Sequence, residues 1–132
     1  MILAGIITVS DKGSQGRRED LSGPAVAEML AGANVNLTCT LIIPDEKDQI
    51  KQAIIRLADK EKLDLILTTG GTGVSPRDVT PDATLEVIDK QIPGMAEAMR
   101  QQSMRITPHA MISRAVAGIR GRCLIVNLPG SP

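Results

Sequence analysis

Residues 63–84 read LDLILTTGGTGVSPRDVTPDAT and contain a predicted strand, a glycine-rich loop and a helix start, in that order. The apolar run Leu63–Thr68 is continuous, as expected of a strand that is buried on both faces of a sheet. After the loop, Thr80-Pro81-Asp82 supplies a helix cap, a proline at the first helical position and an early carboxylate, and the helix is predicted to reach about Ile88. A strand, a loop and a helix in this order form the repeating unit of an α/β protein.

The rest of the chain repeats this alternation of strands and helices. Apolar runs predict further strands at Ile2–Val9, Leu37–Ile43 and Cys123–Leu128, and Val116–Ile119 fits an edge strand. Three segments carry apolar side chains at helical spacing: Val26, Met29, Leu30 and Ala33 behind a cap at Ser22; Ile50, Ala53, Ile54, Leu57 and Ala58; and Met95, Ala98 and Met99 after Pro93-Gly94. Repeated βα units predict a single-domain, three-layer α/β/α fold over residues 1–132, with a mostly parallel sheet and right-handed crossovers.

The composition favours a small-molecule ligand over nucleic acid or a membrane. The 132 residues carry no net charge, whereas a protein that neutralises many phosphates should be basic. Aromatic residues are absent, so the stacking platforms of single-strand binders are missing. A flat ligand ring must therefore lie against aliphatic side chains, peptide planes or arginine. The sequence contains no basic amphipathic helix that would indicate a membrane surface.

The cysteines and the first residues indicate a cytoplasmic protein. Cys39 and Cys123 lie inside apolar runs at a spacing that fits neither a zinc site nor a CxxC pair, so buried free thiols are expected. The apolar run Met1–Val9 lacks a basic leading region and a small-residue cleavage site. A buried strand therefore explains this run better than a signal peptide does.

Polar or glycine-rich segments follow four of the predicted strands. They are Ser10–Gly13, Pro44–Glu46, the loop from Gly70 to Asp78, and Asn127–Ser131. In open parallel sheets, ligands bind at the carboxyl ends of the strands. We therefore expect the four segments to meet at one edge of the sheet and to form the functional site.

The loop Gly70-Gly71-Thr72-Gly73 has the parts of an anion-binding site. Its glycines allow successive backbone N–H groups to point at one oxyanion and admit a ligand close to the chain, and Thr69 and Thr72 add hydroxyl donors. No Gly-Lys-Ser/Thr follows, so this is not a Walker A loop, and it lacks the GxGxxG dinucleotide fingerprint. The alternative is a plain tight turn, but its place after a buried strand favours a function.

Two aspartates beside these segments are candidate metal ligands. Asp82 has a structural role available behind Pro81, whereas Asp78 precedes the expected cap and is not needed by the helix. A carboxylate beside a phosphate-binding loop is repelled by the ligand unless a cation lies between them, so Asp78 is a candidate Mg²⁺ ligand or nucleotide contact. Asp45 is a second candidate, with helix capping after Pro44 as its alternative role.

The basic residues offer phosphate contacts but no hydrolytic triad. Arg77, Arg114 and Arg120 are candidate phosphate clamps, and Arg114, which follows Ser113, is the strongest of them. His109 is the sole histidine, and nothing in the sequence pairs it with a nucleophile. This argues against acyl-transfer hydrolysis and favours positioning with a metal, as in phosphoryl or nucleotidyl transfer.

Seven short runs together resemble one known family. They are Thr8–Asp11, Ile43–Glu46, Thr68–Gly73, Arg77–Thr84, Ile92–Gly94, Ser113-Arg114 and Asn127–Gly130. In this order and over the whole chain, they are similar to the MogA/MoaB family, which includes the G domain of gephyrin-like fusion proteins. The combination of GGTG, RDVTPDAT and NLPG is highly specific for that family.

The resemblance implies a molybdopterin-binding-domain-like fold and a molybdopterin adenylyltransferase. Such enzymes use Mg²⁺ and transfer AMP from ATP to the terminal phosphate of molybdopterin, which gives adenylylated molybdopterin and pyrophosphate for molybdenum cofactor biosynthesis. The resemblance makes Asp45 and Asp78 the catalytic pair and the Mg²⁺ ligands. It places ligand-binding groups at Ser10, Asp11, Thr69, Gly70, Gly71, Thr72, Gly73, Ser113, Arg114, Pro129, Gly130 and Ser131.

The resemblance also implies partners and leaves alternatives open. Family members are usually trimers, sometimes hexamers, and a downstream metal-insertion protein uses their product. They normally continue past NLPG with a C-terminal helix that residues 1–132 lack. A non-catalytic molybdopterin-binding or scaffold protein of the MoaB type is the alternative function, and the presence of Asp45 and Asp78 favours the enzyme. Molybdenum and tungsten both fit as the final metal.

Overall fold

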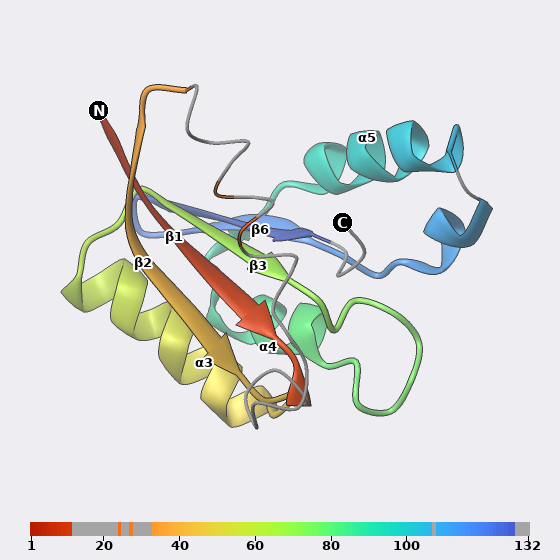
Figure 1. Cartoon of the computed structure of the whole chain (residues 1–132), viewed down its shortest axis with the longest axis horizontal. Coiled ribbons are helices and arrows are strands. Elements are labelled where there is room, and N and C mark those ends of the chain that lie inside the picture. The colour runs from red at the N-terminus through yellow and green to blue at the C-terminus, as the bar shows by residue number, and fades with distance from the viewer. Residues whose placement is uncertain (12–23, 25–26, 28–32, 107, 129–132) are drawn as a thin grey trace.

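The computed structural model describes residues 1–11, 24, 27, 33–106 and 108–128 (Figure 1). In this part of the chain, six strands form one sheet in the order β2-β1-β3-β6-β5-β4. They are β1 (Ile2–Val9), β2 (Val35–Ile43), β3 (Leu65–Thr69), β4 (Lys90–Gln91), β5 (Ala117–Arg120) and β6 (Cys123–Leu128). The strands β1, β2, β3 and β6 run parallel, whereas β5 and β4 pair in antiparallel fashion. The prediction of a mostly parallel sheet is confirmed.

The antiparallel end of the sheet differs from the prediction. The residues expected to form an edge strand, Val116–Ile119, correspond closely to β5, which lies inside the sheet between β6 and β4. β5 returns to β6 through a tight turn in which Gly121 has a φ of +58°. The edge is formed instead by β4, which has only two residues, Lys90 and Gln91. So short a strand carries no alternating pattern by which it could be predicted.

The helices that cover the sheet begin near the predicted positions. They are α3 (Lys47–Ile55), which continues into the π-helical turn η1 (Arg56–Lys60), then α4 (Thr80–Val87), α5 (Pro93–Met104) and the 3-10 turn η2 (Pro108–Ile112). The predicted stripe of α3 is confirmed, because Ile50, Ala53, Ile54 and Leu57 are buried. None of the helices among the described residues is both long and apolar enough to cross a membrane.

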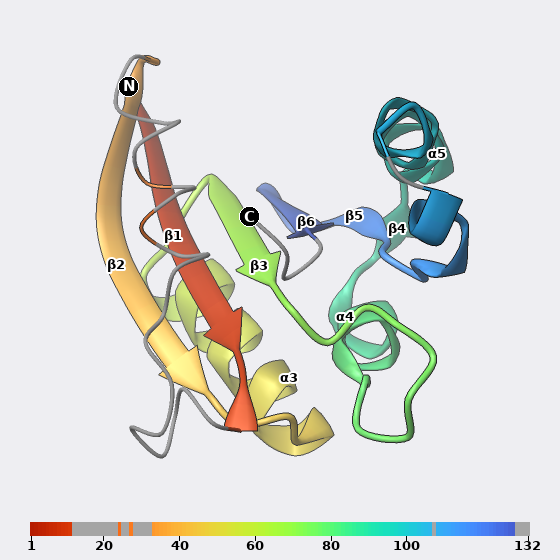
Figure 2. The same ribbon diagram turned by 45° about the vertical axis from the view of Figure 1, so that its right-hand side comes forward.

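α5 buries only part of the predicted side. Ala96 is buried and Met99 packs against the core, whereas Met95 and Ala98 are exposed. The predicted stripe is wrong for Met95 and Ala98, because α5 lies at the β5 end of the sheet and most of its residues are exposed (Figure 2). The predicted helix behind Ser22 lies outside the described residues, apart from two single helical positions at 24 and 27.

Two apolar clusters lie on opposite faces of the sheet. The larger cluster joins α3 and α4 to one face and includes Ile54 and Ile66. The smaller cluster places Met99 of α5 against Leu67 and Val126 on the other face. Because side chains alternate along a strand, the neighbours Ile66 and Leu67 of β3 belong to different clusters. Figures 1 and 2 show α3 and α5 on separate sides of the sheet, so the predicted three-layer arrangement is confirmed.

The parallel strands end together at one edge. Val9 pairs with Ile43, and Thr69 pairs with both Thr8 and Leu128. The segments that follow β1, β2 and β3 therefore leave the sheet side by side, as the sequence predicted. The segment that follows β6, Pro129–Ser131, lies outside the described residues.

Both cysteines are free thiols, as predicted. Cys123 is buried, and its burial, together with the nearby Asp64 and Asp59 carboxylates, raises the pKa of the thiol to about 11. Cys39 is only half-buried because it lies on the edge strand β2. At neutral pH the Cys123 thiol is protonated and is not a nucleophile.

Candidate functional site

The first two glycines of the loop are required by the backbone itself. Gly70 and Gly71 have φ values of +91° and +71°. A Cβ on Gly70 would lie 2.5 Å from the carbonyl oxygen of Val9, and one on Gly71 would collide with the hydroxyl of Thr80. The N–H of Gly70 donates to the carbonyl of Leu128 at 3.1 Å, which ties the start of the loop to β6.

The next three N–H groups of the loop have no acceptor in the described part of the chain. Among the described residues, none accepts a hydrogen bond from the backbone N–H groups of Gly71, Thr72 or Gly73. Three successive free N–H groups beside glycines are the composition of an anion-binding nest. The side chain of Thr72 is buried, whereas Gly71 and Gly73 are half-buried at the edge of the sheet. The anion site stays a prediction, and these N–H groups are its candidate donors.

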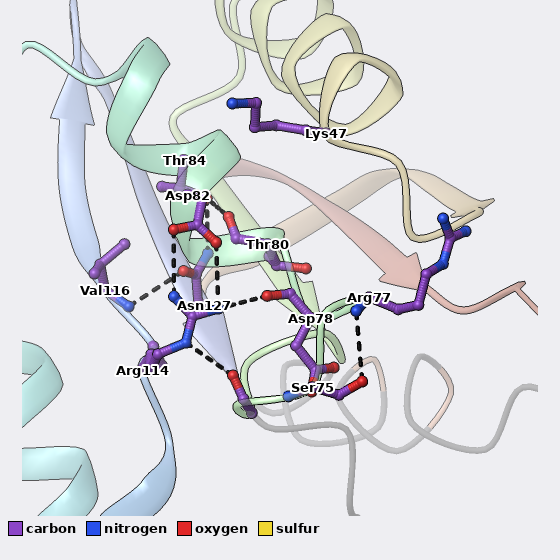
Figure 3. Close-up of polar contacts among 12 residues, drawn as sticks. Lys47, Ser75, Arg77, Asp78, Thr80, Asp82, Thr84, Arg114, Val116 and Asn127 are labelled. Atoms are coloured by element: carbon purple, nitrogen blue, oxygen red, sulfur yellow. Dashed lines mark hydrogen bonds and ion pairs between the residues drawn. The ribbon is translucent and has the colours of Figure 1, made fainter.

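Arg114 binds the carbonyl groups of the same loop (Figure 3). Its Nε donates to the carbonyl of Gly73 at 2.8 Å, and its backbone N–H donates to the carbonyl of Thr72 at 2.7 Å. Its Nη atoms contact both carboxylate oxygens of Asp82 at 3.2 Å, and Nη2 also donates to the carbonyl of Asp78. The predicted phosphate clamp thus has a structural role that sequence reasoning did not assign, because it holds the loop against α4.

Asp45 and Asp11 join the ends of two neighbouring strands. The N–H of Asp11 donates to Oδ2 of Asp45 at 3.0 Å, and the N–H of Asp45 donates to Oδ1 of Asp11 at 2.9 Å. The alternative role of Asp45 as a helix cap is wrong in this structure, because Glu46 occupies the cap position. Asp45 is not used by the helix and points toward the loop, with Oδ1 at 3.2 Å from the position of a Cβ on Gly71.

Charge is concentrated around Asp45. Partial burial raises the pKa of the Asp45 carboxyl, and the nearby negative charges of Asp11 and Asp78 raise it further. Arg77 binds both carboxylate oxygens of Asp11 at 2.9 Å, and this contact lowers the pKa of Asp11. A cation near Asp45 would relieve the repulsion among the three carboxylates. Arg77, a candidate phosphate clamp in the sequence, thus binds a carboxylate of the site.

Asp78 lies in the turn between the loop and α4. Its Oδ2 accepts a hydrogen bond from the N–H of Ser75 at 3.0 Å. As predicted, the helix does not use Asp78 as a cap, because the cap position is occupied by Val79. The expected cap, Thr80, is instead the first residue of α4, so that prediction is wrong by one position. The cause is tertiary, since the N–H of Thr80 donates to the carbonyl of Gly71 at 3.2 Å.

The carboxylates of the site can be compared with the ligands that Mg²⁺ usually takes in proteins. No group of three or more acidic, histidine or cysteine side chains among the described residues is placed to hold a metal ion. Mg²⁺ is usually bound by one or two carboxylates together with water and substrate phosphates. Asp45 Oδ1 lies 3.2 Å from the position of a Cβ on Gly71, and Asp78 Oδ2 lies 2.8 Å from that of a Cβ on Gly73, so both carboxylates flank the same loop. This pair therefore fits Mg²⁺ that is held jointly with a phosphorylated ligand.

A buried asparagine supports the site from below, and its role was not predicted. Asn127 is fully buried, and its Nδ2 donates to the hydroxyls of Thr68 at 2.9 Å and Thr84 at 3.1 Å. Its Oδ1 accepts the N–H of Val116 at 3.2 Å. The asparagine thus ties β6 to β3, to α4 and to the segment before β5. A polar residue within the apolar run Cys123–Leu128 was the available signal.

The other residues predicted for the site make structural contacts, lie away from the loop or fall outside the described residues. The buried Thr69 hydroxyl contacts that of Thr8 at 3.4 Å, and Ser10 donates its N–H to the carbonyl of Ile43 at 2.8 Å. The hydroxyl of Ser113 accepts the N–H of Ala115 at 3.4 Å. Arg120 pairs with Asp59 at 2.8 Å, at the opposite edge of the sheet, so the structure does not bring it to the loop. Pro129, Gly130 and Ser131 lie outside the described residues.

The fold and the site define a class of protein. This is an α/β domain with a glycine-rich loop and two acidic side chains at the carboxyl edge of its parallel strands. A family model described as a probable molybdopterin binding domain matches residues 5–132. The chain belongs to this family, and the resemblance to MogA/MoaB proteins is confirmed.

Individual relatives cover nearly the whole chain. It is 45% identical over 130 residues to the molybdopterin adenylyltransferase of Helicobacter pylori (strain ATCC 700392 / 26695), covering 97% of this chain and 74% of that protein. It is 47% identical over 133 residues to the molybdopterin adenylyltransferase of Escherichia coli (strain K12), covering 97% of this chain and 67% of that one. The crystal structure of the molybdopterin biosynthesis enzyme MoaB from Thermus thermophilus is 53% identical, with a TM-score of 0.95, and the match covers 100% of this chain and 83% of that chain.

Proposed function

We propose that this protein catalyses the Mg²⁺-dependent transfer of AMP from ATP to the terminal phosphate of molybdopterin, giving adenylylated molybdopterin and pyrophosphate. Relatives at 45% and 47% identity are molybdopterin adenylyltransferases. The observation that carries the proposal is the position of Asp45, which lies beside Gly71 and within electrostatic reach of Asp78. A phosphate loop flanked by two carboxylates fits a transfer between phosphates better than simple pterin binding.

Each residue of the site has a separate role in this proposal: binding phosphate, holding Mg²⁺ or positioning the loop. The free N–H groups of Gly71, Thr72 and Gly73 bind a phosphate and neutralise part of its charge. Asp45 and Asp78 hold Mg²⁺, which when bound supplies positive charge to the phosphates. Arg114 keeps the loop in place through Gly73 and Asp82. The other ligand-binding groups are proposed at Ser10, Asp11, Thr69, Gly70, Ser113, Pro129, Gly130 and Ser131.

The experiment is an incubation of the purified protein with molybdopterin, ATP and Mg²⁺. We expect pyrophosphate and adenylylated molybdopterin to form in equal amounts, and omission of Mg²⁺ to stop both. Binding of molybdopterin without release of pyrophosphate would contradict the enzyme. It would support the alternative, a pterin-binding or scaffold protein of the same fold.

We also propose that the protein is a trimer in the cytoplasm. A domain of 132 residues without aromatic side chains gains stability by burying more surface. Apolar side chains on α5, η2 and the segment between them support this, because Ile106 is 88% exposed and Met111 is 64% exposed. Light scattering at micromolar concentration should give the mass of three chains. A monomer under these conditions would contradict the prediction.

A further inference from the structure

Thr80 carries a buried hydroxyl that has no partner among the described residues. It begins α4, is 0% exposed, and its Oγ1 makes no hydrogen bond. Its backbone groups are both used, because the N–H donates to Gly71 and the carbonyl accepts the hydroxyl of Thr84 at 2.9 Å. An unpaired buried hydroxyl is destabilising, and such groups in native structures call for a functional explanation.

The Thr80 hydroxyl faces Gly71 and, beyond it, Asp45. The position that a Cβ would take on Gly71 lies against Thr80 Oγ1 and at 3.2 Å from Asp45 Oδ1. Among the described residues, none donates a hydrogen bond to Oδ1, since the N–H of Asp11 donates to Oδ2. In the described part of the chain, the Thr80 hydroxyl therefore lacks an acceptor and Asp45 Oδ1 lacks a donor, and both lie beside the α-carbon of Gly71.

We propose that Thr80 is a positioning residue whose hydroxyl donates a hydrogen bond to Asp45 Oδ1 when ligand binding draws the loop and the aspartate together. This inference rests on the proposed role of Asp45 in adenylyl transfer. A hydrogen bond to a charged carboxylate is stronger than one between neutral groups, so it can hold Asp45 in one orientation. Glycine at position 71 leaves room for the bond, because a side chain would fill the space between the two oxygens.

Asp45 is a better acceptor for this hydroxyl than a ligand oxygen is. Thr80 Oγ1 is closed off from solvent, whereas Asp45 Oδ1 already lies next to Gly71. The other charged groups around Asp45 do not compete for the hydroxyl. Asp11 and Asp78 are acceptors whose oxygens are bound by Arg77 and by the N–H of Ser75, respectively.

Thr80→Val removes the hydroxyl and keeps the branched shape of the side chain. We expect kcat for adenylyl transfer to fall about tenfold, the effect of one hydrogen bond to a charged group, with KM and Kd for molybdopterin unchanged. Thr80→Ser, which keeps the hydroxyl, should restore most of the turnover. In the Asp45→Asn background, Thr80→Val should cause no further loss, because both changes break the same interaction.

Thr84→Val is the matched control. Thr84 lies one turn later in α4 and is equally buried, but its hydroxyl donates to Thr80 and accepts from Asn127 at 3.1 Å. We expect Thr84→Val to lower the Tm and to leave kcat of the folded protein near normal. Thr80→Val should keep or slightly raise the Tm of the ligand-free protein, since no hydrogen bond is lost there and a buried hydroxyl without a partner is removed.

The outcomes separate this inference from the proposed function. If Asp45→Asn lowers kcat and Thr80→Val does not, Thr80 is a structural residue and the inference is wrong. If Thr80→Val raises KM for molybdopterin even in the Asp45→Asn background, the ligand is the partner of the hydroxyl, which also overturns it. If Asp45→Asn itself leaves kcat unchanged, the proposed function fails independently of Thr80.

Discussion

Replacement of Asp78 by asparagine is expected to lower the rate of adenylyl transfer by roughly two to three orders of magnitude. Asparagine keeps the volume of the side chain, and its carbonyl oxygen can still accept the N–H of Ser75, so the turn should keep its shape. In the proposed mechanism, what is lost is the negative charge of Asp78 that would hold Mg²⁺ beside Asp45. The attack on the α-phosphorus then loses its electrostatic support.

The same substitution should leave the affinity for molybdopterin nearly unchanged. The pterin phosphate is held by backbone N–H groups and hydroxyls in the proposed site, and no carboxylate needs to touch it. Removal of a nearby negative charge could strengthen binding slightly. Initial rates of pyrophosphate release and calorimetric titration with molybdopterin measure the two quantities separately.

An exposed aspartate provides the control for this experiment. Asp48 lies on the exposed side of α3, so Asp48→Asn should keep the normal rate. Asp45→Ala should behave like Asp78→Asn, with a large loss of rate and little change in pterin affinity. Near-normal turnover in both site variants would remove the acidic pair from the mechanism and favour the scaffold protein.

Replacement of Asn127 by leucine is expected to lower the free energy of unfolding by about 3 kcal/mol, because it removes three buried hydrogen bonds. The volume of the side chain is nearly kept, so the loss does not come from a cavity. The N–H of Val116 is left without its acceptor in the core, and the hydroxyls of Thr68 and Thr84 lose their shared donor. Thermal unfolding should show a Tm lower by roughly 10 °C.

Asn36 allows the same substitution at an exposed position of the edge strand β2. Asn36→Leu should change the free energy of unfolding by no more than about 0.5 kcal/mol. Urea titration of both variants gives the comparison directly. Equal stability of Asn127→Leu and the unchanged protein would mean that the buried network contributes nothing to the fold.

Patterns along the chain were enough to predict most of the elements and the edge at which the site forms. Continuous apolar runs predicted β1 and β6 with their observed bounds, and the spacing from Ile50 to Leu57 predicted the buried face of α3. The glycine loop and Asp45 could be placed at one edge because parallel strands carry their carboxyl ends to the same side. These signals are local, and a local pattern can be read without knowledge of the packing.

The use of each side chain in the site follows only from the tertiary structure. Arg114 could be named as a ligand contact from sequence, but only folding brings it to Asp82 and to the carbonyl of Gly73. Thr80 does not cap α4 as predicted, because it is already the first residue of that helix and its N–H donates to the carbonyl of Gly71. Asn127 gains its partners from β3 and α4. Contacts between residues far apart in the chain depend on register and packing, and no pattern within a single segment records them.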